Sequence, residues 1–272
     1  MSAIQQMLIG GNAGVTLKSA ITAAGLTTGL KLCLDASDSS SYDPSVQTDK
    51  WLDVAGSGYD FFLGSGTGSD AADPTFTGVA GDSQSYFAFD GGDYFTYDTT
   101  NETWMQNLHK NNAVFSIVTF FYNPDTASSP VVSTTTGADT GFLLTTGATK
   151  IVSAASNAGA SAMLQQSDNI AGFSSGAYHM VAMSLTEATG SGGGFYYFDG
   201  AYAQVGGSDT FNSTYTSPSS GNAGQTMRLT KYNTDLPPSG TKLSCTAIWE
   251  GTALTKANMD TIWAAMRGRF GI

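Results

Sequence analysis

Two long uncharged runs in the second half of the chain restrict the fold more than any other feature. Residues Tyr178–Leu185 and Phe195–Phe198 hold aromatic, β-branched and other apolar side chains without Asp, Glu, Lys or Arg, which is typical of strands covered on both faces. A Gly-rich link joins them. Asp199 and Gly200 then predict a tight turn before another short strand at 201–205. This stretch predicts a buried β-hairpin.

Further strand candidates follow one another at short spacing along the chain. Only 12% of the 272 residues are charged and 33 are Gly, which is the profile of many short strands joined by turns. The longest candidate, Val114–Tyr122, is expected to be central. The sequence therefore predicts an all-β fold, a two-sheet antiparallel sandwich. The other candidates are 29–34, 50–54, 59–63, 86–89, 94–97, 130–134, 141–146, 150–155, 161–165, 226–232 and 242–249.

Two segments have helical spacing. Asn101–Lys110 predicts a short helix that closes one end of the sandwich. Thr255–Arg267 predicts a C-terminal helix with Thr255 as its N-cap and an apolar face toward the sheets. That face consists of Met259, Ile262, Trp263 and Met266.

The first 28 residues mix short apolar groups with Gly, Ser and Thr and show no long period. We expect residues 1–28 to be an arm held by a partner or a neighbouring copy, and residues 29–272 to form the sandwich. The opening MSAIQQMLIGG has neither the basic nor the long apolar region of a secretory signal. No apolar run approaches the ~20 residues of a membrane helix, so membrane insertion is not expected.

The charge balance argues against one class of partner. A net charge of −11 with only 11 Lys and Arg residues is unsuited to binding nucleic acid. An acidic surface serves solubility or binds cations. Cys33 and Cys245 have no metal-ligand spacing. We expect both to be small buried hydrophobes, although a bond between first and last strands is an alternative.

The order of several segments resembles a known family. They are LKLCLDASDSSSY, KWLDVAGSG, FAFDGGDYFTY, VFSIVTFFY, YHMVAMS with FYYFDGAYA, and a final helix ending RGRFGI. Over residues 25–272 this order resembles the laminin-G-like, concanavalin A-like sandwich domains, and more narrowly those of bacteriophage virion proteins. The resemblance implies a jelly roll whose rim loops hold sugar or calcium in some members. It also implies structural turns at Asp53, Gly56, Asp90, Gly91, Asp199 and Gly200.

The resemblance implies a non-enzymatic virion component: a capsid decoration, head fibre or tail-associated protein. Such a protein is made in the cytoplasm of the bacterial host and located in the virion. It would bind other virion proteins through its arm, form a homo-oligomer and contact host glycans. The alternative is a free carbohydrate-binding or receptor-binding lectin. A third hypothesis is a glycan hydrolase or lyase with an atypical site.

The sequence lacks the residue patterns that glycan-cleaving enzymes usually require. Glycanases on this sandwich present carboxylates at alternate strand positions, and Glu102, Glu187 and Glu250 do not have that spacing. His109 and His179 stand alone in the sequence, and His179 lies in a core strand where a hydrogen-bonded buried histidine is expected.

A serine-nucleophile motif also occurs in the sequence, but its structural context does not fit an enzyme. GFSSG places Gly172, Ser174 and Gly176 in a G-x-S-x-G match, but this match leads into a strand instead of a helix.

Two groups of residues are candidates for ligand binding. Asp35, Asp38 and Asp43 lie in a loop after the first strand and form either a calcium site or a solvated acidic turn; no other cofactor is expected. Aromatic residues in rim loops can stack on sugar rings, although core or interface packing is the alternative for each. These aromatic residues are Trp104, Phe211, Tyr215 and Tyr232, two of them in the long loop 206–225.

Overall fold

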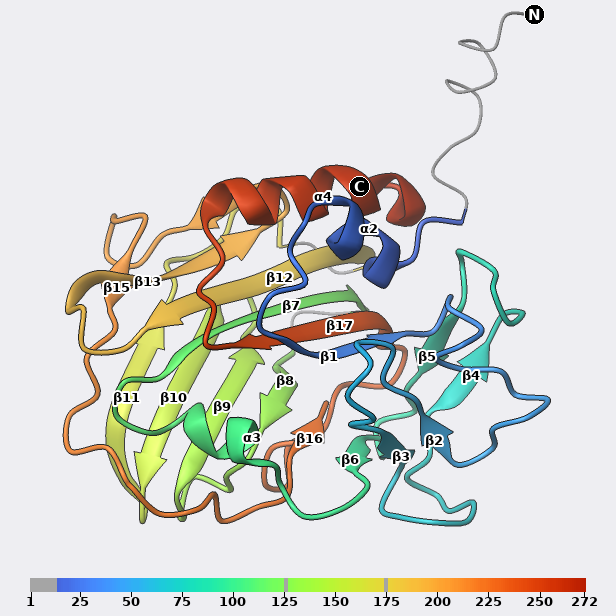
Figure 1. Ribbon diagram of the computed structural model, residues 1–272, viewed down its shortest axis with the longest axis horizontal. Helices are drawn as coiled ribbons and strands as arrows, with labels where there is room; N and C mark the ends of the chain where they lie inside the picture. Colours follow the sequence, from blue (N-terminus) through green and yellow to red (C-terminus); the bar gives the residue numbers. More distant parts are fainter. Residues whose placement is uncertain (1–13, 125–126, 174–175) are drawn as a thin grey trace, which may run out of the picture.

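The predicted hairpin forms two adjacent strands of the larger of two sheets (Figure 1). The computed structural model describes residues 14–124, 127–173 and 176–272. In it, β12 (Ala177–Thr186) pairs with β13 (Ser191–Phe198) on one side and with β7 (Val114–Asn123) on the other. β17 (Lys242–Glu250) pairs with the far edge of β7.

The strands form two antiparallel sheets, which we call sheet A and sheet B. Sheet A has the order β14-β13-β12-β7-β17-β5-β4, with β1 also on β17 and β15 also on β13. Its remaining strands are β1 (Leu30–Asp35), β4 (Thr75–Thr77), β5 (Tyr86–Ala88), β14 (Ala201–Ala203) and β15 (Phe211–Asn212).

Sheet B has the order β11-β10-β9-β8-β16-β6-β3-β2. These strands are β2 (Lys50–Trp51), β3 (Phe61–Leu63), β6 (Phe95–Tyr97), β8 (Ser129–Ser133), β9 (Gly141–Thr146), β10 (Ile151–Asn157), β11 (Ala160–Gln166) and β16 (Arg228–Leu229). The predicted all-β, two-sheet jelly-roll sandwich with a C-terminal helix is confirmed.

Sheet A is buried on both faces, which explains why its central strands lack alternation. In β12, Val181 and Met183 pack in the core between the sheets. Met180 and Ala182, on the opposite face, belong to a second core. Because side chains alternate between faces, a strand buried on both reads as one continuous apolar run.

The second core lies beneath two helices on the outer face of sheet A (Figure 1). α4 (Lys256–Phe270) begins with a capping box between Thr255 and Asn258. It buries Met259, Ile262 and Met266. Helix α3 (Thr103–Asn107) does not belong to the second core. It is shorter than predicted and buries Trp104 and Met105.

The prediction of an arm needs correction for part of its length. α2 (Leu17–Ala23) is a helix with Leu17 and Ile21 fully buried in the second core. It has only 7 residues, so the 3.6-residue period has too few turns to stand out. Residues 1–13 lie outside the described residues, and anchoring by them stays a prediction.

The boundaries of other elements also differ from the predicted ones. The predicted strand at 226–232 is reduced to Arg228–Leu229 because the backbone turns into the left-handed region at Thr230, where φ is 62°. The short strands β4 and β15 were not predicted. None of the described helices is both long and apolar enough to cross a membrane.

The cysteines are not bonded. Cys33 and Cys245 lie on the paired strands β1 and β17 and are free and fully buried. Cys33 is opposite Ala247, whereas Cys245 is opposite Asp35. Burial raises the pKa of both thiols well above its usual value, so they act as the small buried hydrophobes that the sequence predicted.

Candidate functional site

A surface pocket of about 390 Å³ lies at the β14 edge of sheet A. We call it the edge pocket. One wall is the segment that follows β11, and the other is the turn from β13 into β14. It is lined by Asp168, Asn169, Ile170, Ala171, Gly172, Phe198, Asp199, Ala201, Tyr202, Ala203 and Gln204.

The turn that positions Asp199 is fixed by backbone geometry. Asp199 and Gly200 have φ of 44° and 93°, the left-handed pair that a two-residue hairpin turn requires. A Cβ on Gly200 would lie 2.9 Å from Nε1 of Trp263. Glycine at position 200 therefore permits the positive φ and leaves room for the close packing of α4.

The Asp199 carboxylate is held from the side of the protein. Its Oδ1 accepts the Met180 N–H at 2.8 Å, and its Oδ2 lies 2.7 Å from Nδ1 of His179. His179 is buried against the rings of Phe173 and Phe198, with centroids 5.3 and 4.8 Å away. The prediction of a hydrogen-bonded buried histidine is confirmed.

Asp168 holds the opposite wall. Its carboxylate accepts the N–H groups of Gly206 and Gly207 at 3.0 and 2.8 Å. Its own N–H donates to the carbonyl of Gln204 at 2.6 Å. These bonds join the segment after β11 to the chain that follows β14.

An aromatic ring completes the edge pocket. Tyr202 is half-buried and its ring packs edge-to-face against Phe195, with centroids 5.3 Å apart. Lys256 lies 5.7 Å from the Tyr202 ring centroid and pairs with Asp260 at 2.7 Å. Carboxylates and amides together suit a polyhydroxylated ligand, because the hydroxyls donate to their oxygens.

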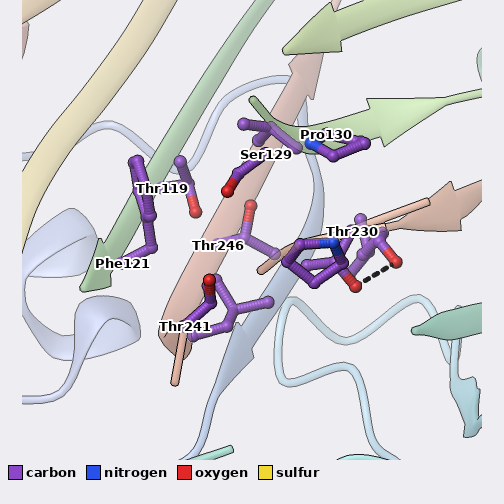
Figure 2. A pocket seen from close by; sticks show the side chains of 11 residues that line it. Thr119, Phe121, Ser129, Pro130, Thr230, Thr241 and Thr246 are labelled. Atoms are coloured by element: carbon purple, nitrogen blue, oxygen red, sulfur yellow. Dashed lines mark hydrogen bonds between the residues drawn. The ribbon is translucent and has the colours of Figure 1, made fainter. Parts of the chain in front are cut away.

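A second cavity lies between the sheets and is much smaller (Figure 2). It has a volume of about 20 Å³, which is room for about one water molecule. Hydroxyls of Thr119, Ser129 and Thr246 are among its lining groups (Figure 2). It is too small for a sugar.

The three aspartates predicted for calcium do not converge. Asp35 is fully buried, and its carboxylate is bound by the Arg269 guanidinium at 2.8 and 2.9 Å. Asp38 and Asp43 accept backbone N–H groups of their own turns. The described chain contains no group of three or more His, Cys, Asp or Glu side chains that could hold a metal ion. The prediction is wrong for Asp35, and calcium binding stays a prediction.

Nor do the four predicted aromatic residues form a platform. Trp104, Phe211 and Tyr215 are each 4% exposed and pack in the core between the sheets. Their bulk fills the sandwich, so the ligand-binding prediction is wrong for these three. Tyr232 is half-buried and lies beside Leu143 and Ala154 of sheet B, away from the edge pocket.

The residues expected to shape turns lie in turns. Asp53 accepts the N–H groups of Cys33 and Ala55 at 2.9 and 2.8 Å, and Asp90 accepts that of Gly92 at 2.8 Å. Gly56 and Gly91 have φ of 102° and 104°.

The three glutamates are dispersed and engaged. Glu187 is buried and accepts the N–H groups of Asn112 and Tyr215. Glu102 accepts the Tyr97 hydroxyl and Glu250 an amide N–H of Asn107. Ser174 of the G-x-S-x-G match lies outside the described residues.

Sequence reasoning missed most of the edge pocket. Asp199 was interpreted only as a turn residue, and Asp168, Asn169, Tyr202 and Gln204 were not selected. The only local signal was the Asp199-Gly200 turn, which fixes one wall. The other wall depends on the fold bringing residue 168 against residues 204–207.

Comparisons with known proteins show the fold. No protein-family model matches the sequence, and no curated protein does. Among solved structures, the botulinum neurotoxin type G receptor binding domain has a TM-score of 0.53 at 12% identity, covering 87% of this chain and 51% of that one. The serotype D domain in complex with N-acetylneuraminic acid has a TM-score of 0.55 at 11% identity, with 90% and 52% covered.

A third similar structure is the binding domain of botulinum neurotoxin DC in complex with rat synaptotagmin II, with a TM-score of 0.52, 10% identity, and 88% and 52% covered. The chain thus spans about half the length of these structures. They are not virion proteins, so the virion prediction gains no support from them. At this identity the likeness establishes that the chain has the sandwich fold of receptor-binding domains.

Proposed function

We propose that this protein is a non-enzymatic, lectin-like binding module and that its edge pocket holds a sugar of a surface glycan. The observation that carries the proposal is the edge pocket, which is lined by two carboxylates that protein N–H groups hold in place and by the half-buried Tyr202. The similar solved structures support it, since they are receptor-binding domains and one was solved with a sugar.

The arrangement of the carboxylates favours binding. Asp168 and Asp199 each have their oxygens oriented by protein donors, and each carboxylate oxygen can accept a further hydrogen bond. Acceptors that are already held in place lose little entropy when a ligand arrives. A sugar with neighbouring hydroxyls can therefore donate hydrogen bonds to these carboxylates while it contacts Tyr202.

The test is a glycan array followed by calorimetry on the bound glycans. Replacing Tyr202→Ala should weaken binding by about tenfold, because a tyrosine side chain that lines the edge pocket is lost. The matched control is Tyr232→Ala, a half-buried tyrosine outside the edge pocket, which should leave the affinity unchanged. An unchanged affinity in Tyr202→Ala, or an array without any bound glycan, would contradict the proposal.

A further inference from the structure

The edge pocket is acidic. Asp168 and Asp199 line it, and a third carboxylate, Asp209, accepts a hydrogen bond from Gln204 at its rim at 3.2 Å. Asp168 and Asp209 have no ion pair with any other described residue. An anionic group placed beside them would meet uncompensated negative charge.

Positive charge near the edge pocket is already engaged. No Lys or Arg belongs to the described lining. Lys256, 5.7 Å from the Tyr202 ring centroid, donates to the Gly200 carbonyl at 3.4 Å and bonds both oxygens of Asp260 at 2.7 and 2.9 Å. His179 lies behind Asp199, 3% exposed, and bonds its carboxylate. The lining thus contains many hydrogen-bond acceptors and no cation directed at a ligand.

From this charge pattern we infer that the edge pocket selects neutral or amino sugars and rejects sugars that carry a carboxylate or sulfate. The inference rests on the proposed function. It departs from the serotype D neurotoxin domain, whose solved complex contains the anionic N-acetylneuraminic acid. Two sandwiches with the same fold would then recognise sugars of different charge, since ligand choice depends on the site and not on the fold.

The experiment uses array glycans in matched pairs that differ by one sialic acid or one sulfate group. For each pair, we compare only the part of the array binding signal that is lost in the Tyr202→Ala variant. We expect the uncharged member to bind at least tenfold more tightly at low salt. At ~0.5 M NaCl the ratio should shrink, because screening acts over about 10 Å at 0.1 M and less at higher salt.

Charge-removing variants provide a second readout. Asp209→Asn removes a charge at an exposed position on the rim. It should reduce the ratio of the affinities for the uncharged and the anionic glycan about two- to threefold. The affinity for the uncharged glycan itself should not change. Asp168→Asn should reduce the ratio further, although this change also disturbs the bonds to Gly206 and Gly207. For that reason Asp209→Asn is the deciding variant.

The outcomes separate the two claims. Tyr202-dependent binding of the anionic member, as tight as that of the neutral one, would overturn the charge selectivity and leave the proposed function in place. A ratio that is insensitive to both salt and Asp209→Asn would also overturn the selectivity. Binding that survives in Tyr202→Ala for every glycan would overturn both.

Discussion

At the scale of single residues, Asp35 shows how a carboxylate in a predicted surface loop can serve the interior. It is fully buried and binds Arg269 through two hydrogen bonds, and it also accepts the Leu17 N–H at 2.7 Å. One side chain thereby joins strand β1 to the N-terminus of α2 and the C-terminus of α4. A calcium ion at Asp35 would have to displace the guanidinium.

Removing the cation should cost far more than a surface change. Arg269→Ala leaves the Asp35 charge buried without a partner, so we expect a loss of about 3–5 kcal/mol in the free energy of unfolding. Urea denaturation measures it. Arg267→Ala, an exposed arginine in the same turn of α4, is the control and should change the value by less than about 0.5 kcal/mol. Equal effects of the two changes would refute the role of the ion pair.

Asp93 should make stability depend on pH. Burial raises its pKa from the usual 3.8 to about 6, with a further contribution from the nearby Asp90 carboxylate. A raised folded-state pKa means that the folded protein binds this proton more tightly than the unfolded chain. The resulting stabilisation is complete below pH 3.8 and is lost as the pH rises through about 6.

The measurement compares melting temperatures of the wild type and Asp93→Asn across this window. The wild type should gain stability relative to the variant as the pH falls from about 7 to about 4. The amide introduced by Asp93→Asn would still offer an acceptor to the Asp90 N–H, which now donates to Asp93 at 2.7 Å. Parallel pH curves would show that Asp93 does not titrate in this way.

At the scale of elements, α4 packs over the second core and covers it. Ile262 is fully buried in it, together with Phe120 and Met180 of sheet A. Ile262→Ala should lower the free energy of unfolding by about 2–4 kcal/mol, because a buried side chain leaves a cavity. The control Ala264→Ser, exposed in the same helix, should be near neutral. A small effect of Ile262→Ala would mean that α4 is not tightly packed.

The elements that the sequence predicted well are those whose pattern is local and long. The hairpin, the strand at 141–146 and the C-terminal helix each carry their own apolar run or cap, and the structure has all three. α2 and β4 were missed because 7 and 3 residues are too short to display a period. Trp104, Phe211 and Tyr215 were interpreted as rim aromatics because the burial of such side chains depends on contacts distant in sequence.

At the scale of the whole molecule, the sandwich provides a rigid frame with the edge pocket at one border. Both faces of sheet A are covered, and the edge pocket lies at its β14 edge and the turns beside it. Asp168 and Asp199 are 31 positions apart in sequence, so their juxtaposition follows from the topology of β11 to β14. No local motif in the sequence contains this site.

The most direct test of glycan binding follows backbone amide shifts in the ¹⁵N-labelled protein during titration with an uncharged glycan selected on the array. A sugar in the edge pocket predicts the largest shifts at Asn169–Gly172 and Ala201–Gln204, with the glycan recovered intact. Shifts confined to the surface around Tyr232, or a cleaved glycan, would contradict a non-enzymatic binding site at the edge pocket.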